Sequence, residues 1–458
     1  MSRELGTQRE LEATKAVIGE LAKHLNVNVA LELWDGTVIP LGKGAQEEIR
    51  FVVASANVLR RLLREPSLIS VAELYATGDL DIVGANPVDA MRGVDHLQFL
   101  RLPKKVNKAR LLKMALPILL KSYSASSFVK RFTKKAGATP TSGRDDKEMI
   151  GFHYDLSNEF YSLFLDEEMV YSSAYFPTPD ATLDDAQLNK LDLICRKLRL
   201  APGDRLFDPG CGWGGLLCYA AKHYGVDAYG TTLSTEQFDF VNAKIAKMGL
   251  GDKVKIELRD CRSISDDKIF DKIAQVEMIE HVGIANHHDF YRYLRKHMRP
   301  RGVYFGQASF RRNTERPEDF PKLTPYMQFI VKYIFPGGEL DHVGMTTGAL
   351  ERAGFEVHEV EAVREHFGYT TEHWVRRLYD RREEGAALVG MPQTRIWLLY
   401  LSLCALSFHR GALNAFQVVA TSRHSGASGV GFDRITEYGG ARRVGTEEAA
   451  SETARKTA

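Results

Sequence analysis

The sequence predicts an α/β fold in which a doubly wound parallel (Rossmann-like) sheet follows a small N-terminal α+β domain. Three observations predict this fold. Strand patterns alternate with helical patterns from residue 183 to residue 309, as in a parallel sheet with crossover helices. A glycine-dense turn joins a strand pattern to a helix within residues 205–223, and an alternating hairpin pattern occupies residues 27–40. The 458 residues are enough for two or three domains.

The small N-terminal domain is predicted to end near residue 95. Residues 14–25 have helical spacing. Residues 27–40 alternate between apolar and polar and turn at Asp35-Gly36, which predicts a hairpin. Residues 67–82 form another apolar stretch that ends in a Gly-Asp turn. We see no catalytic constellation in this part of the sequence.

A basic segment follows the small domain. Between Asp95 and Asp145 there is no acidic residue, whereas twelve Lys or Arg stand among apolar residues. Such a segment favours an anionic membrane surface. A solvated linker is one alternative, and a nucleic-acid site is a weaker one because no recognition module or stacking pattern accompanies the charge.

The predicted domain boundaries follow from these shifts in composition. Residues 136–147 are polar and contain Pro, Gly and Ser, which predicts a linker. We therefore expect a small domain at 1–95, a basic helical segment with its linker at 96–149, and a larger domain at 150–422. Residues 423–458 are rich in Gly, Ser, Arg and Glu and predict a disordered tail.

The larger domain is predicted to contain the sheet. Its expected elements are, in order, a helix at 183–198, a strand at 206–207, a helix at 216–223, a strand at 226–232, a helix at 235–248, strands at 254–258, 271–276, 302–309 and 355–360, and helices at 374–382 and 394–408. Strands that alternate with helices at this spacing indicate a doubly wound sheet.

The turn after the first strand of this sheet carries the clearest chemical signal. Asp208 ends that strand, and the sequence D-P-G-C-G-W-G-G brings glycines to positions 210, 212, 214 and 215. Such a turn exposes bare backbone and a helix N-terminus to a ligand. A dinucleotide site would have G-x-G-x-x-G without that carboxylate and an acid about 20 residues further on. The pattern favours S-adenosylmethionine (SAM) over a dinucleotide and over a turn without a ligand.

Cysteine spacing, apolar runs and charge indicate where in the cell the protein is expected. Five cysteines occur without C-x-x-C spacing, which favours reduced thiols in the cytosol and no structural metal. The N-terminus lacks the apolar core of a secretory peptide, and the longest apolar run, 396–408, is too short to span a bilayer. With a net charge of +2 and ordinary apolar content, the sequence predicts a cytoplasmic protein.

Several long motifs resemble one known family. They are HYDLSNEFYSLFLDEEMVYSSAYF, FDPGCGWGG, TTLSTEQ, EMIEHVG and KYIFPGG, in this order. The chain resembles the cyclopropane-fatty-acyl-phospholipid synthases from residue 150 to about residue 420, and its ELYATGDLD stretch resembles the lipid-binding domain of bacterial members. The resemblance implies a SAM-dependent C-methyltransferase that adds a methylene across the cis double bond of an acyl chain in a membrane phospholipid.

Carried over by position, the resemblance also implies the residues of the SAM site. Asp208 would orient the loop amides or the amino acid part of SAM, and Asp260 and Arg262 would lie near the adenine. The remaining residues are Tyr171 and Ser172 from the aromatic segment, Gly210, Gly212 and Gly214 from the loop, and Thr232, Leu233, Ser234 and Gln237 along the ribose.

The implied chemistry explains why aromatic residues are dense. An alkene is a weak nucleophile, so the methyl group must be held in line with it. Methyl transfer then leaves a carbocation, which ring faces and a carboxylate stabilise. The candidate rings are Tyr171, Tyr175, Phe176, Tyr304 and Tyr333, and Glu280 is the candidate anion. Core packing is the alternative for each ring, and a helix N-cap is the alternative for Glu280.

The resemblance further implies a bicarbonate ion as the base, held in the family by a Cys, a Glu, a His and a Tyr. This sequence keeps the Glu as Glu280 but has Ser173 at the Cys position and Gln307 at the His position. Phe367 stands at the Tyr position unless a small gap restores Tyr369. Glutamine lacks the charge and the titration of histidine. The product is therefore open between a cyclopropane and a methylene- or methyl-branched chain.

The expected partners are an anionic phospholipid membrane, bound peripherally at its inner face, and an unsaturated acyl chain, without nucleic acid. A homodimer stays open. Three other functions compete. A small-molecule SAM methyltransferase would not need the basic segment, a non-enzymatic lipid-binding protein has no use for the glycine loop, and an RNA methyltransferase would not need the aromatic segments.

Overall fold

The computed structural model describes residues 6–94, 106–121, 156–265 and 267–430. The chain divides into two compact units. Unit 1 comprises Met1–Phe164, Asn313–Gly338 and Thr371–Ala412, and unit 2 comprises Leu165–Arg312, Glu339–Thr370 and Leu413–Ala458. Each unit therefore gathers segments that are far apart in the sequence.

Unit 2 contains a seven-stranded sheet in the order β10-β11-β9-β8-β5-β6-β7. The strands are β5 (Arg205–Asp208), β6 (Asp227–Thr232), β7 (Val254–Leu258), β8 (Phe270–Val276), β9 (Met298–Arg311), β10 (Phe355–Ala362) and β11 (Leu413–Ser422). The five strands from β9 to β7 in this order run parallel. The predicted α/β fold is confirmed.

The sheet is mixed because β11 runs antiparallel to both β9 and β10. Sequence analysis did not predict this strand, which follows directly after a long apolar helix. The reversed strand places Gln417 opposite Gln307 in the register of β11 and β9. It thereby adds a polar neighbour to a predicted site residue.

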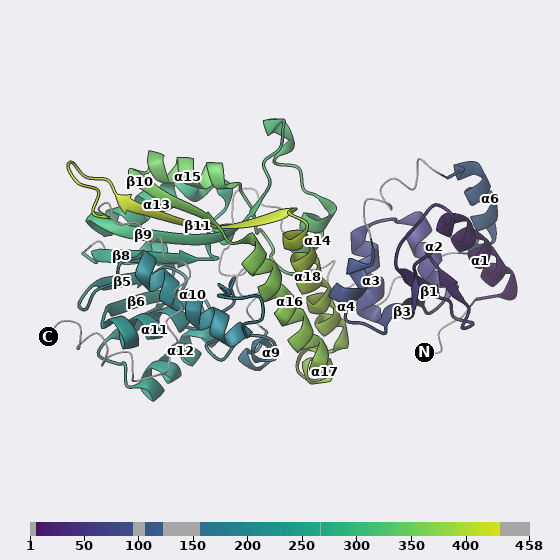
Figure 1. Ribbon diagram of the computed structural model, residues 1–458, viewed down its shortest axis with the longest axis horizontal. Coiled ribbons are helices and arrows are strands. Elements are labelled where there is room, and N and C mark those ends of the chain that lie inside the picture. The colour runs from purple at the N-terminus through teal and green to yellow at the C-terminus, as the bar shows by residue number, and fades with distance from the viewer. Residues whose placement is uncertain (1–5, 95–105, 122–155, 266, 431–458) are drawn as a thin grey trace. The chain divides into compact units, whose positions relative to one another are not determined.

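Helices cover both faces of this sheet (Figure 1). They are α10 (Leu183–Lys197), α11 (Gly215–Tyr224), α12 (Thr235–Met248), α13 (His287–Lys296), α15 (Val343–Arg352) and the first part of α16 (Arg364–Asp380). Successive residues of a strand point to opposite faces. Leu206 accordingly lies in a core with residues of α10, α11 and α12, and Phe207 lies in another with residues of α13 and α15.

Unit 1 contains a four-stranded sheet in the order β2-β1-β3-β4. Its strands are β1 (Val29–Glu32), β2 (Val38–Pro40), β3 (Gln46–Val53) and β4 (Leu80–Val83). β1 and β2 pair antiparallel, as the hairpin prediction requires. The helix α3 (Leu68–Thr77) ends at Gly78, whose φ of 70° is a left-handed conformation that favours glycine. The predicted small α+β domain is present.

Further helices complete unit 1. They are α1 (Gln8–Ala22), α2 (Ala56–Arg64), α4 (Pro87–Arg92), α6 (Lys108–Leu119), α9 (Asn158–Ser162), α14 (Pro325–Tyr333), α17 (Arg382–Val389), α18 (Met391–His409) and the second part of α16. α3 packs against α14 and α18. No helix in the described ranges is long and apolar enough to cross a membrane.

Some predictions fall outside the described residues. The predicted linker at 136–147 lies there entirely, as do the flanks of the basic segment at 96–105 and 122–144 and the last part of the predicted tail, 431–458. Within the basic segment, α6 is the part that the structure describes.

Candidate active site

The predicted site residues of unit 2 follow four neighbouring strands. β8, β5, β6 and β7 are parallel neighbours, so their carboxyl ends lie at one edge of the sheet. Asp208 ends β5, Thr232 ends β6, and Asp260 lies two residues after β7. Glu277 comes directly after β8. Ligands of such sheets bind at this edge.

The turn after β5 has the backbone that the glycine pattern predicts. Gly212 and Gly214 have φ angles of 51° and 74°, which side chains with a Cβ rarely adopt. A Cβ atom at Gly212 would meet no atom within 4 Å, so this part of the loop faces open space. Helix α11 begins at Gly215 and directs its free amide groups toward the same turn. The loop can therefore approach a ligand through bare backbone.

Two of these glycines are also required by close packing. A Cβ at Gly210 would lie 2.8 Å from Met278 Cγ, and one at Gly214 would lie 2.7 Å from Val241 Cγ1. The first contact matters for the site. It shows that the glycine loop touches the turn that follows β8.

Asp208 stabilises the loop from inside. Its Oδ1 accepts a hydrogen bond from the Gly210 amide at 3.1 Å, and burial raises the pKa of its carboxyl group to about 7. The side chain thus orients a loop amide.

The end of β6 forms a small polar ring. Thr232 Oγ1 donates to Gln237 Oε1 at 2.7 Å and accepts from the Ser234 amide at 3.2 Å. Ser234 caps α12 by accepting from the Gln237 amide at 3.3 Å. Leu233 is partly exposed, whereas the other three residues are buried. The stretch predicted to lie along the ribose is therefore held by its own hydrogen bonds.

After β7, Asp260 and Arg262 bind one another. Asp260 Oδ1 accepts from the Arg262 amide at 2.8 Å, and Asp260 Oδ2 lies 2.5 Å from Arg262 Nη2. Arg262 is exposed. The Arg262 backbone amide is thus engaged by its own turn, and the pair lies at the same edge of the sheet as the glycine loop.

A buried lysine joins the aromatic segment to the strand ends. Lys190 of α10 is 1% exposed, and its Nζ donates to Ser172 Oγ at 2.9 Å. Its charge acts on the carboxyl groups of Asp166, Asp208 and Glu277, while burial lowers its pKa. One cation therefore faces three carboxyl groups in this region.

Two carboxyl groups lie together beyond β8. Glu277 Oε1 accepts from Gln307 Nε2 at 3.2 Å, and Glu277 Oε2 accepts from Ser309 Oγ at 3.0 Å. Glu280 Oε1 accepts from the Ser309 amide at 2.7 Å. The carboxyl groups of Glu277 and Glu280 are close enough to share a hydrogen bond. We call these two residues the carboxyl pair.

The carboxyl pair retains a proton more readily than ordinary glutamates. Burial raises the pKa of Glu280 well above its usual range, and the charge of Glu277 raises it further. Burial also raises the pKa of Glu277, against the hydrogen bonds that it accepts. Two carboxylates this close cannot both ionise easily, so the pair titrates as a unit.

The structure brings three predicted catalytic residues together. Gln307 Nε2 reaches the Ser173 carbonyl oxygen at 3.4 Å as well as Glu277, which in turn meets Glu280. Ser173 contributes its backbone here, because its hydroxyl donates to the Ala174 carbonyl oxygen at 3.0 Å.

The predicted aromatic residues have packing partners. Tyr175 stacks on His366 with ring centroids 4.1 Å apart, and Tyr304 Oη donates to Gln275 Oε1 at 2.8 Å within a core cluster. Tyr333 lies in unit 1, where its hydroxyl donates to Glu73. Phe367 is buried near the start of α16, and Tyr171 is partly exposed. Their catalytic or binding roles remain predictions.

Comparison with known proteins identifies the family. The family model described as mycolic acid cyclopropane synthetase matches residues 141–418, which is more than half of the chain. The chain belongs to this family. It is a SAM-dependent methyltransferase.

Two relatives extend beyond the matched region. The chain is 35% identical over 401 residues to a probable fatty acid methyltransferase of Pseudomonas putida, covering 88% of this chain and 93% of that protein. It is 33% identical over 369 residues to a probable fatty acid methyltransferase of Mycobacterium tuberculosis, covering 79% and 84%.

Two solved structures of the family are similar to this one. The cyclopropane synthase MmaA2 from Mycobacterium tuberculosis aligns with a TM-score of 0.57 and 29% identity, over 62% of this chain and all of that one. The mycolic acid cyclopropane synthase CmaA1, complexed with SAH and CTAB, aligns with a TM-score of 0.56 and 30% identity, over 60% of this chain and 98% of that one.

The residues of this family member fit SAM. The left-handed glycines leave the backbone bare, and the space in front of Gly212 is open. Gly210, Gly212 and Gly214 would hold the donor, with Asp208 fixing the loop. SAM supplies an electrophilic methyl group when bound.

The residues around the carboxyl pair do not fit a bicarbonate ion. Both hydrogens of the Gln307 amide are used, on Glu277 and on the Ser173 carbonyl, and its Oε1 accepts from Gln417 Nε2 at 2.9 Å. Ser309 gives its hydroxyl and its amide to the carboxyl pair. An anion placed here would meet carboxylates and no spare donor among these residues.

Sequence reasoning missed two members of the site. Glu277 stands in the motif EMIEHVG, in which the resemblance implies a role only for Glu280. Lys190 stands on the apolar face of a predicted helix. An acid directly after a strand, and a lysine at a core position, were the signals available.

Proposed function

We propose that this enzyme transfers the methyl group of SAM to the cis double bond of unsaturated acyl chains in membrane phospholipids. The observation that carries the proposal is the buried carboxyl pair, which lies on the turn whose Met278 packs against the glycine loop. An alkene that accepts a methyl cation becomes a carbocation, and fixed negative charge in a site of low dielectric stabilises it.

Each residue of the site has a task in this reaction. The backbone of the glycine loop would bind the methyl donor, and Asp208 holds the Gly210 amide of that loop in place. Lys190 holds Ser172 and so fixes the aromatic segment against α10. The carboxyl pair supplies the negative charge, and Gln307 and Ser309 hold the pair in place.

The acyl substrate is supported by the relatives. The P. putida and M. tuberculosis proteins are both called probable fatty acid methyltransferases. Both alignments cover more of this chain than the family model does, and this supports a common substrate class.

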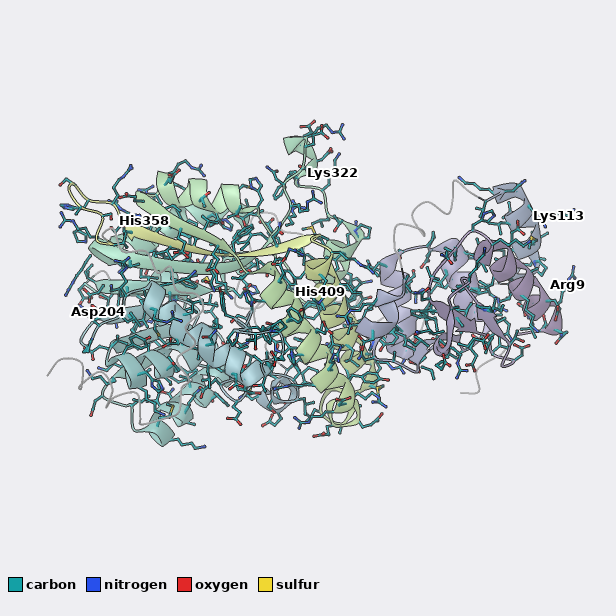
Figure 2. The ribbon with its side chains drawn as sticks, viewed as in Figure 1. Arg9, Lys113, Asp204, Lys322, His358 and His409 are labelled. Carbon is teal, nitrogen blue, oxygen red and sulfur yellow. The ribbon has the colours of Figure 1, made fainter. Side chains whose placement is uncertain are left out.

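Helix α6 supports a membrane-bound form of that substrate. Leu112, Leu116 and Leu120 are 60%, 52% and 74% exposed and follow one another at intervals of four, which puts them on one side of a helix. Lys108 and Lys113 are also exposed on α6, and Figure 2 labels Lys113 there. Exposed leucines beside basic residues suit peripheral binding to an anionic leaflet.

The product is either a cyclopropane or a methylene- or methyl-branched chain. The carboxyl pair and Gln307 support a methylene- or methyl-branched product, since the bicarbonate base of the family's cyclopropane synthases has no fitting site here. A hydride shift before proton loss leads to a methylene branch on the acyl chain.

The proposal is tested by expressing the protein in a bacterium that has unsaturated phospholipids and no enzyme of this family. Fatty acids are then analysed by mass and by proton NMR. A mass gain of one CH₂ in acyl chains is expected, with upfield ring protons for a cyclopropane or vinylic methylene protons for a branched chain. Active, SAM-binding protein without any such gain would refute the acyl substrate and favour a small-molecule methyltransferase.

A further inference from the structure

Three of the four oxygens of the carboxyl pair are held by neutral donors. Both oxygens of Glu277 accept hydrogen bonds, one from the Gln307 side-chain amide and one from the Ser309 hydroxyl. Glu280 Oε1 accepts from the Ser309 backbone amide. Glu280 Oε2 is shielded from solvent and accepts no hydrogen bond from any donor in the described residues. The Glu277 carboxyl lies within hydrogen-bond reach of the Glu280 carboxyl, so the two can share a proton.

The surrounding charges are too few to ionise both carboxyls. Lys190 from α10 is the cation that acts on Glu277, and it is shared with Asp166 and Asp208. Tyr304 from β9 and Tyr291 from α13 also face Glu280, and burial raises the pKa of both phenols, so they stay neutral. Burial and the proximity of the two carboxyls therefore favour the state in which the pair holds one proton and one negative charge.

The backbone holds the pair in an unusual conformation. Glu277 has a φ of 49°, a left-handed value that is uncommon for a residue with a side chain. Its amide is fixed to the Gln307 carbonyl oxygen at 2.7 Å. Strained residues of this kind concentrate at active sites. As whole residues Glu277 and Glu280 are partly buried, and Glu280 Oε2 is shielded from solvent.

We propose that the carboxyl pair of Glu277 and Glu280 is the base of this methyltransferase and takes the place of a bound bicarbonate ion. The inference rests on the proposed function, because it assigns a role in the second half of that reaction. It follows from the Glu280 oxygen left without a donor, from the packing of Met278, which lies between the two glutamates in the sequence, against the glycine loop, and from the lack of a fitting anion site.

The proton transfer balances without a further reactant. After methyl transfer the acyl chain carries a positive charge. For a ring, a C–H bond of the transferred methyl group breaks, and its electron pair forms the bond to the cationic carbon. For a branched chain, a C–H bond on a carbon bonded to the cationic carbon breaks, and its electron pair forms a carbon–carbon double bond. The proton goes to the ionised carboxylate of the pair, which then holds two protons and no charge. One proton passes to water before the next turnover.

The test compares Glu277→Gln and Glu280→Gln with Glu359→Gln, a matched change at a carboxylate of β10 that is paired with Lys197. Turnover is measured with purified enzyme and unsaturated phospholipid vesicles. General base catalysis is worth roughly 10²- to 10⁴-fold, so each variant of the pair is expected to lose turnover by that factor, whereas Glu359→Gln keeps it. Affinity for S-adenosylhomocysteine, measured by calorimetry, should stay the same in all three.

An infrared measurement without substrate gives a readout besides activity. The spectrum of wild-type protein at neutral pH should contain a band of a shielded protonated carboxyl group that is missing from Glu280→Gln, in addition to the band of Asp208, which both proteins share. Wild-type enzyme that methylates acyl chains but shows no such band, or variants of the pair that keep full turnover, would overturn the inference. Wild-type enzyme that shows the band but yields no methylated acyl chain would instead contradict the proposed function.

Discussion

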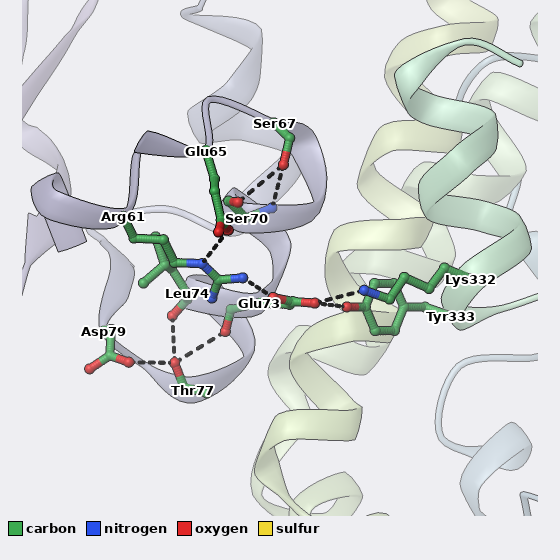
Figure 3. A network of polar contacts seen from close by, with 10 residues as sticks. All are labelled: Arg61, Glu65, Ser67, Ser70, Glu73, Leu74, Thr77, Asp79, Lys332 and Tyr333. Atoms are coloured by element: carbon green, nitrogen blue, oxygen red, sulfur yellow. Dashed lines mark hydrogen bonds and ion pairs between the residues drawn. The ribbon is translucent and has the colours of Figure 1, made fainter. Parts of the chain in front are cut away.

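Two clusters of buried carboxyl groups in this protein are built in opposite ways. In unit 1, Glu73 of α3 is 1% exposed. It forms ion pairs with Arg61 and Lys332 and accepts a hydrogen bond from the Tyr333 hydroxyl (Figure 3). In unit 2, Glu277 and Glu280 accept hydrogen bonds from a side-chain amide, a hydroxyl and a backbone amide, all of which are neutral.

The difference shows what each cluster can do. A carboxylate with two cations is held in its ionised form and ties helices together. A carboxyl pair with neutral donors keeps a proton that it can exchange, because its charge is only partly compensated. The first arrangement is expected to serve stability and the second chemistry.

Breaking the cation-paired cluster should have the largest effect on folding. Glu73→Ala removes the close anion of buried Arg61, whose other carboxylate, Glu65, lies 3.9 Å away, and the anion of partly buried Lys332. Breaking such a buried pair costs about 3–5 kcal/mol. The free energy of unfolding, measured in urea, should fall by that amount. Glu280→Gln serves as the comparison, because it removes no cation's partner. A smaller loss for Glu73→Ala than for Glu280→Gln would reverse the assignment of the two clusters.

Removing Lys190 should widen the difference between the two clusters, because it takes away the cation that acts on Glu277. Lys190→Met takes away the cation that Asp166, Asp208 and Glu277 share, and breaking such a buried pair costs about 3 kcal/mol. The raised pKa of Asp208 should rise further, since the attraction of Lys190 lowers it. Carboxyl titration followed by infrared spectroscopy measures this, and an unchanged Asp208 would contradict the shared charge.

Tyr333→Phe separates a structural role from the catalytic role predicted for Tyr333. The variant removes one hydrogen bond to the charged Glu73, worth about 1.5–3 kcal/mol. Urea unfolding should register that loss. If stability stays at the wild-type value while turnover falls, the residue acts on substrate instead.

The carboxyl pair should make stability depend on pH in a characteristic direction. The pKa of Glu280 is raised in the folded state, so the folded protein binds more protons than the unfolded chain as pH rises above the ordinary value of 4.5. Stability therefore falls with rising pH in that window, by up to about 1.4 kcal/mol per pH unit for this group. Glu280→Gln lacks the group, so the difference in unfolding free energy between wild type and variant should follow this slope. Parallel pH profiles would mean that the pKa of Glu280 is unshifted.

The smallest expected effect concerns α6. Leu112→Ser with Leu116→Ser should weaken binding to anionic vesicles roughly tenfold, since two leucines no longer enter the lipid interface. Leu388→Ser, at a leucine of α17 that is 46% exposed, is the matched control. Equal affinity of all variants in a vesicle sedimentation assay would remove α6 from the membrane surface.

Much of the fold could be predicted from the sequence because it rests on local patterns. The residues predicted for the helix at 235–248 and the strand at 254–258 are those of α12 and β7. The strand β11 was missed, since its place in the sheet depends on pairing with β9, more than a hundred residues earlier in the sequence. Pairing at that distance leaves no periodic signal.

The candidate site was predictable in part for a similar reason. Glu280 and Gln307 could be named because they stand in motifs, and the structure brings them together through Glu277. The partnership of Glu277 with Glu280 depends on a left-handed turn, and that of Lys190 with three carboxyls depends on how α10 crosses the sheet. Neither can be inferred from spacing along the chain.

The central claim is that the enzyme carries its own base, and one measurement tests it most directly. Turnover of purified wild-type enzyme on unsaturated phospholipid vesicles is measured in buffer freed of carbon dioxide and again after bicarbonate is added. Because Glu277 and Glu280 accept the proton in this account, the two rates should be equal. A rate that collapses without bicarbonate and returns when it is added would show that the carboxyl pair is not the base.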